Sequence, residues 1–69
     1  MPQKILLYSN YCKMCDEVKE ILRKDIIAGN ISIVNIDKNA DGRVLARLFG
    51  GVPTLLEEAN GEIYELVLQ

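Results

Sequence analysis

The spacing of the apolar residues changes at Cys12. Before it, residues 4–9 (KILLYS) form a short and nearly continuous apolar run, which is typical of a buried strand. After it, apolar residues recur every three or four positions with charged residues between them, which is typical of an amphipathic helix. The helical stripe consists of Met14, Cys15, Val18, Ile21, Leu22 and Ile26. The chain is therefore expected to begin with a strand and a helix, and Gly29 and Asn30 are expected to end that helix.

A second strand and a second helix are expected to follow. Residues 31–37 (ISIVNID) are rich in β-branched apolar side chains and are bounded by turn residues, which predicts a strand. Residues 44–49 carry a shorter helical stripe, with Asp41 as its expected N-cap and Gly50 and Gly51 as its end.

The last third of the chain predicts a β-hairpin. Two strand-like runs, 54–57 and 62–68, flank Asn60-Gly61, a dipeptide that is common in tight hairpin turns. The order of elements is then βαβαββ, in which a right-handed crossover makes the first two strands parallel. Residues 1–69 are expected to form a single α/β domain, a four-stranded mixed sheet with one helix on each face.

The composition of the chain restricts its partners and its location. The net charge is −2 and no basic stripe is visible, so nucleic acid is not an expected partner. No apolar run approaches the ~20 residues of a membrane span, and the N-terminal run is shorter than that of a signal peptide. Two cysteines are too few for a secreted disulfide scaffold. The expected location is the cytoplasm, with no membrane partner.

Cys12 and Cys15 stand where the strand gives way to the helix, and their spacing places both sulfurs on one side of it. Cys12 is expected at the exposed N-terminal end, where free N–H groups and the helix dipole favour a thiolate, so we expect a lowered pKa. Lys13 adds a positive charge that favours the thiolate, whereas Asp16 and Glu17 oppose it. Cys15 shares the apolar stripe and is expected to be more buried.

This asymmetry suits thiol–disulfide exchange. Cys12 would attack a substrate disulfide, and Cys15 would then attack Cys12 to release the reduced product. Two other interpretations stay open. Cysteine can also serve as a small apolar core residue. The chain has no histidine and only one cysteine pair, so a zinc ion or an iron–sulfur cluster would need cysteines from two chains.

Two motifs in this order of elements carry a resemblance to a known family. With YCKMC at residues 11–15 and VPT at residues 52–54, the chain resembles the thioredoxin/glutaredoxin superfamily over nearly its whole length. Residues 34–62 (VNIDKNADGRVLARLFGGVPTLLEEANGE) are similar to the second half of a thioredoxin. Residues 5–22 (ILLYSNYCKMCDEVKEIL) are more similar to the start of a glutaredoxin.

The resemblance implies a role for several residues. Cys12 matches the nucleophile, Cys15 the resolving cysteine, and Tyr11 a position that is aromatic in many members. Pro53 matches a proline with a cis peptide bond, and the backbone of Val52 would pair with an extended substrate segment. The implied activity is thiol–disulfide oxidoreduction of protein disulfides, with a reductase or thiol reductant as partner and no cofactor beyond the two thiols. The alternative is a binding module of the same fold that holds a metal or an iron–sulfur cluster across a dimer.

Some features of the family are not visible in the chain. The middle of the motif, Lys13-Met14, is neither the Gly-Pro of thioredoxins nor the Pro-Tyr of many glutaredoxins, and no glutathione-binding segment is recognisable. The C-terminal helix of the family also has no counterpart. An exposed apolar sheet face usually marks an interface, so we expect a homodimer through the face or edge of the last strand. A monomer whose first helix covers that face is the alternative.

Overall fold

The computed structural model of the chain describes residues 3–67. Its elements are β1 (Gln3–Tyr8), α1 (Lys13–Ile21), α2 (Arg23–Ile27), β2 (Ile31–Asn35), α3 (Ala40–Leu48), β3 (Thr54–Ala59) and β4 (Glu62–Leu66). Leu68, with which the last strand was expected to end, lies outside the described residues, as do the two ends of the predicted domain 1–69.

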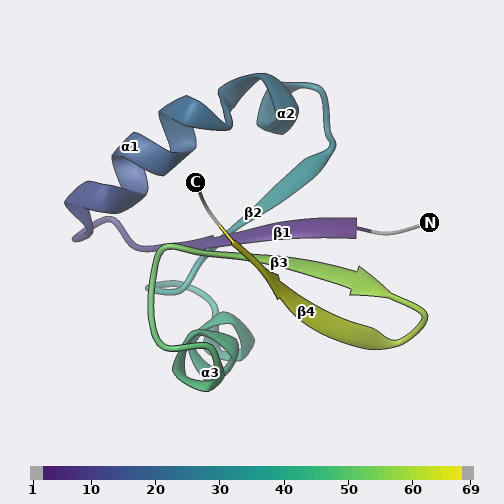
Figure 1. Cartoon of the computed structure of the whole chain (residues 1–69). Helices are drawn as coiled ribbons and strands as arrows, with labels where there is room; N and C mark the ends of the chain where they lie inside the picture. The colour runs from purple at the N-terminus through teal and green to yellow at the C-terminus, as the bar shows by residue number, and fades with distance from the viewer. Residues whose placement is uncertain (1–2, 68–69) are drawn as a thin grey trace.

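The four strands form one mixed sheet in the order β2-β1-β3-β4. β1 runs parallel to β2 and antiparallel to β3, and β3 and β4 form an antiparallel hairpin. Helices α1 and α2 cover one face of the sheet, and α3 lies on the other (Figure 1). The prediction of an α/β fold with a four-stranded mixed sheet is confirmed.

Each face of the sheet has its own apolar core. Neighbouring strand residues point to opposite faces, so Leu6 and Leu7, both fully buried, belong to different cores. The core under α1 and α2 consists of Leu6, Ile31 and Leu55, with Val18, Leu22, Ile26 and Leu66 packed against them. The core under α3 consists of Leu7, Ala46 and Leu56, with Ile5, Val34, Ile36, Leu45, Phe49 and Val52 packed against them.

The single helix expected after Cys12 is two helices. Leu22 leaves helical geometry with φ −94° and ψ 8°, and α2 follows directly. Val18 before this interruption, Leu22 at it and Ile26 after it all pack against the same core.

The N-cap of α3 is Asn39, and the expectation of Asp41 was wrong. The Asn39 side chain accepts a hydrogen bond from the Gly42 N–H at 2.8 Å, while Asp41 lies within the first turn. Gly42 is buried, and a Cβ atom there would lie 2.8 Å from Cγ1 of Val34 on β2. The helix therefore begins at Ala40, earlier than its apolar stripe indicated, and approaches the sheet through a glycine.

The hairpin turn lies at Asn60-Gly61, as expected. Both residues have positive φ, 56° and 80°, which the favoured two-residue hairpin turn requires. Ala59 pairs with Glu62, so β3 runs two residues further than predicted. The Tyr64 hydroxyl donates to the Glu62 carboxylate. This hydrogen bond is the main cause, and desolvation a smaller cause, of a rise in the pKa of Tyr64 above its ordinary value.

Candidate functional site

The two cysteines lie at the start of α1, where the structure holds them as a disulfide. Their Cα atoms are 5.2 Å apart. Cys12 is half-buried, whereas Cys15 is fully buried and has no exposed surface. The helix was expected to include Cys12, but it begins one residue later, and Cys12 is its N-cap.

As the N-cap, Cys12 directs its sulfur toward the backbone N–H groups of the first helical turn. It has extended geometry, with φ −118° and ψ 108°, and its Sγ accepts a hydrogen bond from the Cys15 N–H at 3.1 Å. Serine or asparagine oxygens usually fill this role. The positive end of the helix dipole acts at the same place. Once the disulfide is reduced, both interactions would stabilise negative charge on the Cys12 sulfur.

The loop before Cys12 is held by Ser9 and Asp37. The Ser9 carbonyl accepts from the Cys12 N–H at 3.3 Å, and the Ser9 hydroxyl accepts from the Tyr11 N–H at 3.2 Å. The same hydroxyl donates to the two Asp37 carboxylate oxygens at 3.1 and 2.9 Å. The Asn10 N–H donates to Asp37 Oδ2 at 2.9 Å. The Asp37 carboxylate therefore accepts hydrogen bonds from both Ser9 and Asn10, the first two residues of the loop.

Parallel strand pairing brings Asp37 to this loop. Tyr8, the last residue of β1, pairs with Asn35, the last residue of β2, and the Ile36 N–H donates to the Tyr8 carbonyl at 2.9 Å. Ser9 and Asp37 follow these strands and therefore meet at the same edge of the sheet. Both residues stand at the ends of the strands predicted from the sequence, 4–9 and 31–37, and neither was assigned to the site, although a polar residue at the carboxyl end of each of two parallel strands was a usable signal.

The loop that contains Pro53 lies at the same end of the sheet. Because β1 and β3 are antiparallel and Leu7 pairs with Thr54, the start of β3 is next to the end of β1. The peptide bond between Val52 and Pro53 is cis. The Val52 side chain packs against the core under α3.

Two glycines lead the chain from α3 to Val52. Gly50 and Gly51 have φ values of 93° and 116°, which L side chains rarely adopt. The Gly51 N–H donates to the Ala46 carbonyl at 2.6 Å, which joins this turn to the last turn of the helix. The position of the loop before β3 is thereby tied to α3.

A groove of about 560 Å³ runs between α1 and the β3–β4 hairpin and includes Pro53. Met14, which stands between the two cysteines in sequence, also lines it. The remaining lining residues are Glu17, Val18, Ile21, Leu22, Leu55 and Val67. The groove therefore connects the motif at residues 12–15 with the loop at Pro53.

Tyr11 and Lys13, the other residues singled out in the sequence, flank Cys12 and project into solvent. The Tyr11 side chain is 92% exposed, and Lys13 is exposed as well. Neither makes a side-chain hydrogen bond among residues 3–67. Their surroundings leave both side chains accessible to a partner molecule that approaches Cys12.

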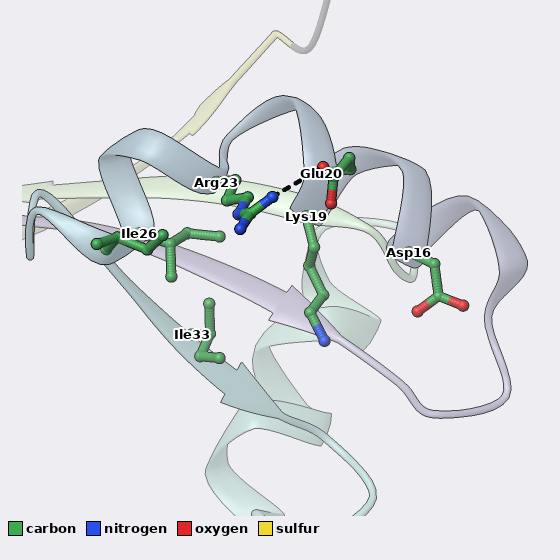
Figure 2. A pocket seen from close by; sticks show the side chains of 7 residues that line it. Asp16, Lys19, Glu20, Arg23, Ile26 and Ile33 are labelled. Carbon is green, nitrogen blue, oxygen red and sulfur yellow. Dashed lines mark hydrogen bonds and ion pairs between the residues drawn. The ribbon is translucent and has the colours of Figure 1, made fainter.

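A second cavity, of about 460 Å³, lies over β2 beside α1 and α2 (Figure 2). It is lined by Asp16, Lys19, Glu20, Arg23, Ile26, Ile27 and Ile33. Arg23 and Glu20 form an ion pair at 3.5 Å. Lys19 extends toward β1 (Figure 2), and its Nζ lies 4.3 Å from the centre of the Tyr8 ring. Neither cysteine contributes to this cavity.

Residues 3–67 contain no group of three or more His, Cys, Asp or Glu side chains placed to hold a metal ion. Within the same residues, no helix has the length and apolar character that crossing a membrane requires.

Comparison with models of known protein families, and with curated proteins, found no match to this chain. The candidate site is therefore identified from the structure alone, as a disulfide between cysteines spaced three apart at a helix N-terminus in a small α/β fold.

Proposed function

We propose that this protein is a thioredoxin-like thiol–disulfide oxidoreductase that acts on protein disulfides. The observation that carries the proposal is the difference between its two cysteines. Cys12 is half-buried and caps α1 with its sulfur, whereas Cys15 is fully buried one turn further on. A reactive cysteine needs access and a stabilised thiolate, and a resolving cysteine needs only to reach its partner.

The exchange proceeds in two steps from the reduced protein. The Cys12 thiolate attacks one sulfur of a substrate disulfide, forms a mixed disulfide and releases the other substrate sulfur as a thiolate that takes up a proton. Cys15 then loses its proton and attacks the Cys12 sulfur, which restores the internal disulfide and releases the second substrate thiol. In total, two electrons pass from the Cys12/Cys15 pair to the substrate, and the two substrate thiolates take up two protons, which balance the one that Cys12 released to solvent on ionising and the one that Cys15 loses.

The substrate-binding roles rest on Tyr11, Val52 and Pro53. In our proposal the Val52 backbone pairs with an extended substrate segment, Pro53 packs beside the reacting sulfurs, and the Tyr11 ring contacts the substrate from the other side. Lys13 supports the thiolate by its charge. The exposure of Tyr11 and the position of Pro53 in the groove with Met14 support this arrangement.

The proposed reaction needs a second partner but no cofactor. After each turnover the Cys12–Cys15 disulfide must be reduced by an external dithiol or by a reductase. The dithiol itself carries the electrons. We propose the cytoplasm as its location, because thiols are kept reduced there and cysteine pairs in that compartment more often serve redox chemistry than structure.

The first test is Cys15→Ser, which removes the resolving thiol and leaves the nucleophile. Incubated with a disulfide-bonded protein, this variant is expected to accumulate a mixed disulfide through Cys12 that thiol reductants release. Mass spectrometry of the trapped complex identifies the linked cysteine. Cys12→Ser is the matched control, because it keeps one thiol, the buried one, and is expected to trap little.

The reduction potential of the pair gives an independent test. Equilibration with a defined thiol buffer is expected to show a reversible internal couple. A value near about −270 mV would indicate a thioredoxin-like reductant, and about −200 to −230 mV a glutaredoxin-like one. Failure to form an internal disulfide over this range would contradict the proposal. Bound zinc or iron that Cys15→Ser loses would instead support a metal-binding module.

A further inference from the structure

We infer that Asp37 is a positioning residue for Cys12: its carboxylate holds the loop from Ser9 to Cys12 so that the Cys12 sulfur stays at the N-terminus of α1. This inference rests on the proposed function and assigns the control of its nucleophile. Asp37 stands 28 residues from Ser9 in sequence, in the turn after β2.

The contacts form a continuous path from Asp37 to Cys12. The carboxylate accepts from the Ser9 hydroxyl and from the Asn10 N–H, both at 2.9 Å to Oδ2. Ser9 in turn accepts two hydrogen bonds: its hydroxyl accepts from the Tyr11 N–H, and its carbonyl accepts from the Cys12 N–H. Each of the four residues from Ser9 to Cys12 thus takes part in a hydrogen bond of this network.

A carboxylate suits this role chemically. An ionised carboxylate only accepts hydrogen bonds and can take several at once, so it fixes the Ser9 hydroxyl as a donor toward Asp37. The hydroxyl oxygen is then left to accept from Tyr11. Ser9 is 9% exposed, so the Ser9 end of this hydrogen bond is buried, whereas Asp37 itself is exposed. Asp37 is itself oriented, because its N–H donates to Asn35 Oδ1 at 2.9 Å.

The negative charge of Asp37 and its hydrogen bonds are expected to have opposite effects on the reactivity of Cys12. A negative charge near Cys12 disfavours a thiolate, so removing it would make Cys12 more reactive if charge were the dominant effect. Loss of the hydrogen bonds would free the loop and take the Cys12 sulfur away from the Cys15 N–H. That change makes Cys12 less reactive. The two effects differ in sign, which allows an experiment to separate them.

The experiment measures the rate at which iodoacetamide alkylates Cys12 across a range of pH. All proteins carry Cys15→Ser, so that Cys12 is the only thiol. Asp37→Ala removes the carboxylate, Ser9→Ala removes the hydroxyl and keeps the charge, and Ser9→Thr restores a hydroxyl. Asp25→Ala is the matched control, because Asp25 also accepts a side-chain hydrogen bond, from Asn30 at 3.3 Å, on α2.

We expect Asp37→Ala and Ser9→Ala to slow alkylation at low pH by roughly fivefold, the size of a lost helix cap, and to move the pH profile upward. The double variant is expected to behave like either single one, because both act through one network. Ser9→Thr is expected to recover the rate, and Asp25→Ala to leave it unchanged. Circular dichroism and urea unfolding identify any variant that loses its fold.

Two results would overturn the inference. If Asp37→Ala speeds alkylation and Ser9→Ala does not change it, Asp37 acts by its charge. If neither changes the rate or the pH profile, the network does not control Cys12. Failure of the proposed function looks different, because the parent Cys15→Ser protein would then trap no mixed disulfide, whatever the effect of the Asp37 variants.

Discussion

At the scale of single residues, the two cysteines share a helix turn but differ in their surroundings. Cys15 is fully buried on the side of α1 that faces the sheet, and Cys12 is half-buried at the helix end with its sulfur accepting the Cys15 N–H. A sequence spacing of three makes the disulfide geometrically accessible. Burial decides which sulfur an external molecule can reach.

We therefore predict that iodoacetamide modifies Cys12 in preference to Cys15 in the reduced protein. The expected selectivity is about tenfold or more, because a thiol without exposed surface cannot meet the reagent. Quenching at early times followed by peptide mass spectrometry measures it. In guanidinium chloride, which unfolds the chain, the two rates are expected to converge. Equal rates in the native protein would contradict the assignment of Cys12 as the nucleophile.

At the scale of elements, α3 determines where the loop containing Pro53 lies. Asn39 caps the start of α3, and Gly42 allows this helix to approach β2 closely. At the other end of α3, the Gly51 N–H donates a hydrogen bond to the carbonyl of Ala46, and Ala46 is buried in the core under α3. A shift of this helix would therefore move the loop before β3 relative to Cys12.

Gly42→Ala tests this close approach. A Cβ atom would lie 2.8 Å from Val34 Cγ1, so helix and strand must separate, and we expect a loss of stability of about 1–3 kcal/mol. Urea unfolding measures it. Val44→Ala on the same helix is the control, because Val44 is 57% exposed and its loss is expected to change stability by no more than about 0.5 kcal/mol. Equal effects of the two substitutions would show that α3 does not depend on this contact.

At the scale of the whole molecule, the two strand pairings of β1 bring the site together. Parallel pairing with β2 brings Asp37 to the loop after β1, and antiparallel pairing with β3 brings Pro53 to the same end. The site is thus assembled around β1, one of the two central strands of the sheet (Figure 1).

The homodimer expected from the sequence remains a prediction at this scale. Met14, Ile21 and Val67, which line the groove, are 63%, 73% and 81% exposed. Apolar side chains gathered in this way are typical of an interface. We expect sedimentation equilibrium to show concentration-dependent association that Ile21→Glu weakens, whereas Val44→Glu on α3 leaves it unchanged. A monomer at every concentration would contradict the dimer.

Much of the fold follows from local patterns in the sequence. Runs of β-branched residues, a stripe with helical spacing and Asn60-Gly61 are short-range signals, so the presence and order of the strands, the hairpin and the helical regions were correctly predicted. The strand predicted over residues 31–37 ends at Asn35, and Asp37 lies in the turn after it. The helix boundaries were less predictable. The interruption at Leu22 leaves no trace in the apolar stripe, which continues through it, and the choice of Asn39 over Asp41 depends on which side chain reaches the Gly42 N–H.

By itself, the sequence determined the order of the strands and helical regions, because local patterns of apolar residues decide it, and it determined the candidate pair Cys12 and Cys15 through their spacing of three. Only the tertiary structure placed Ser9 against Asp37 and set the strand order β2-β1-β3-β4. These features join residues far apart in the chain. Their partners are selected by strand pairing and by burial on two faces of one sheet, which no local pattern records.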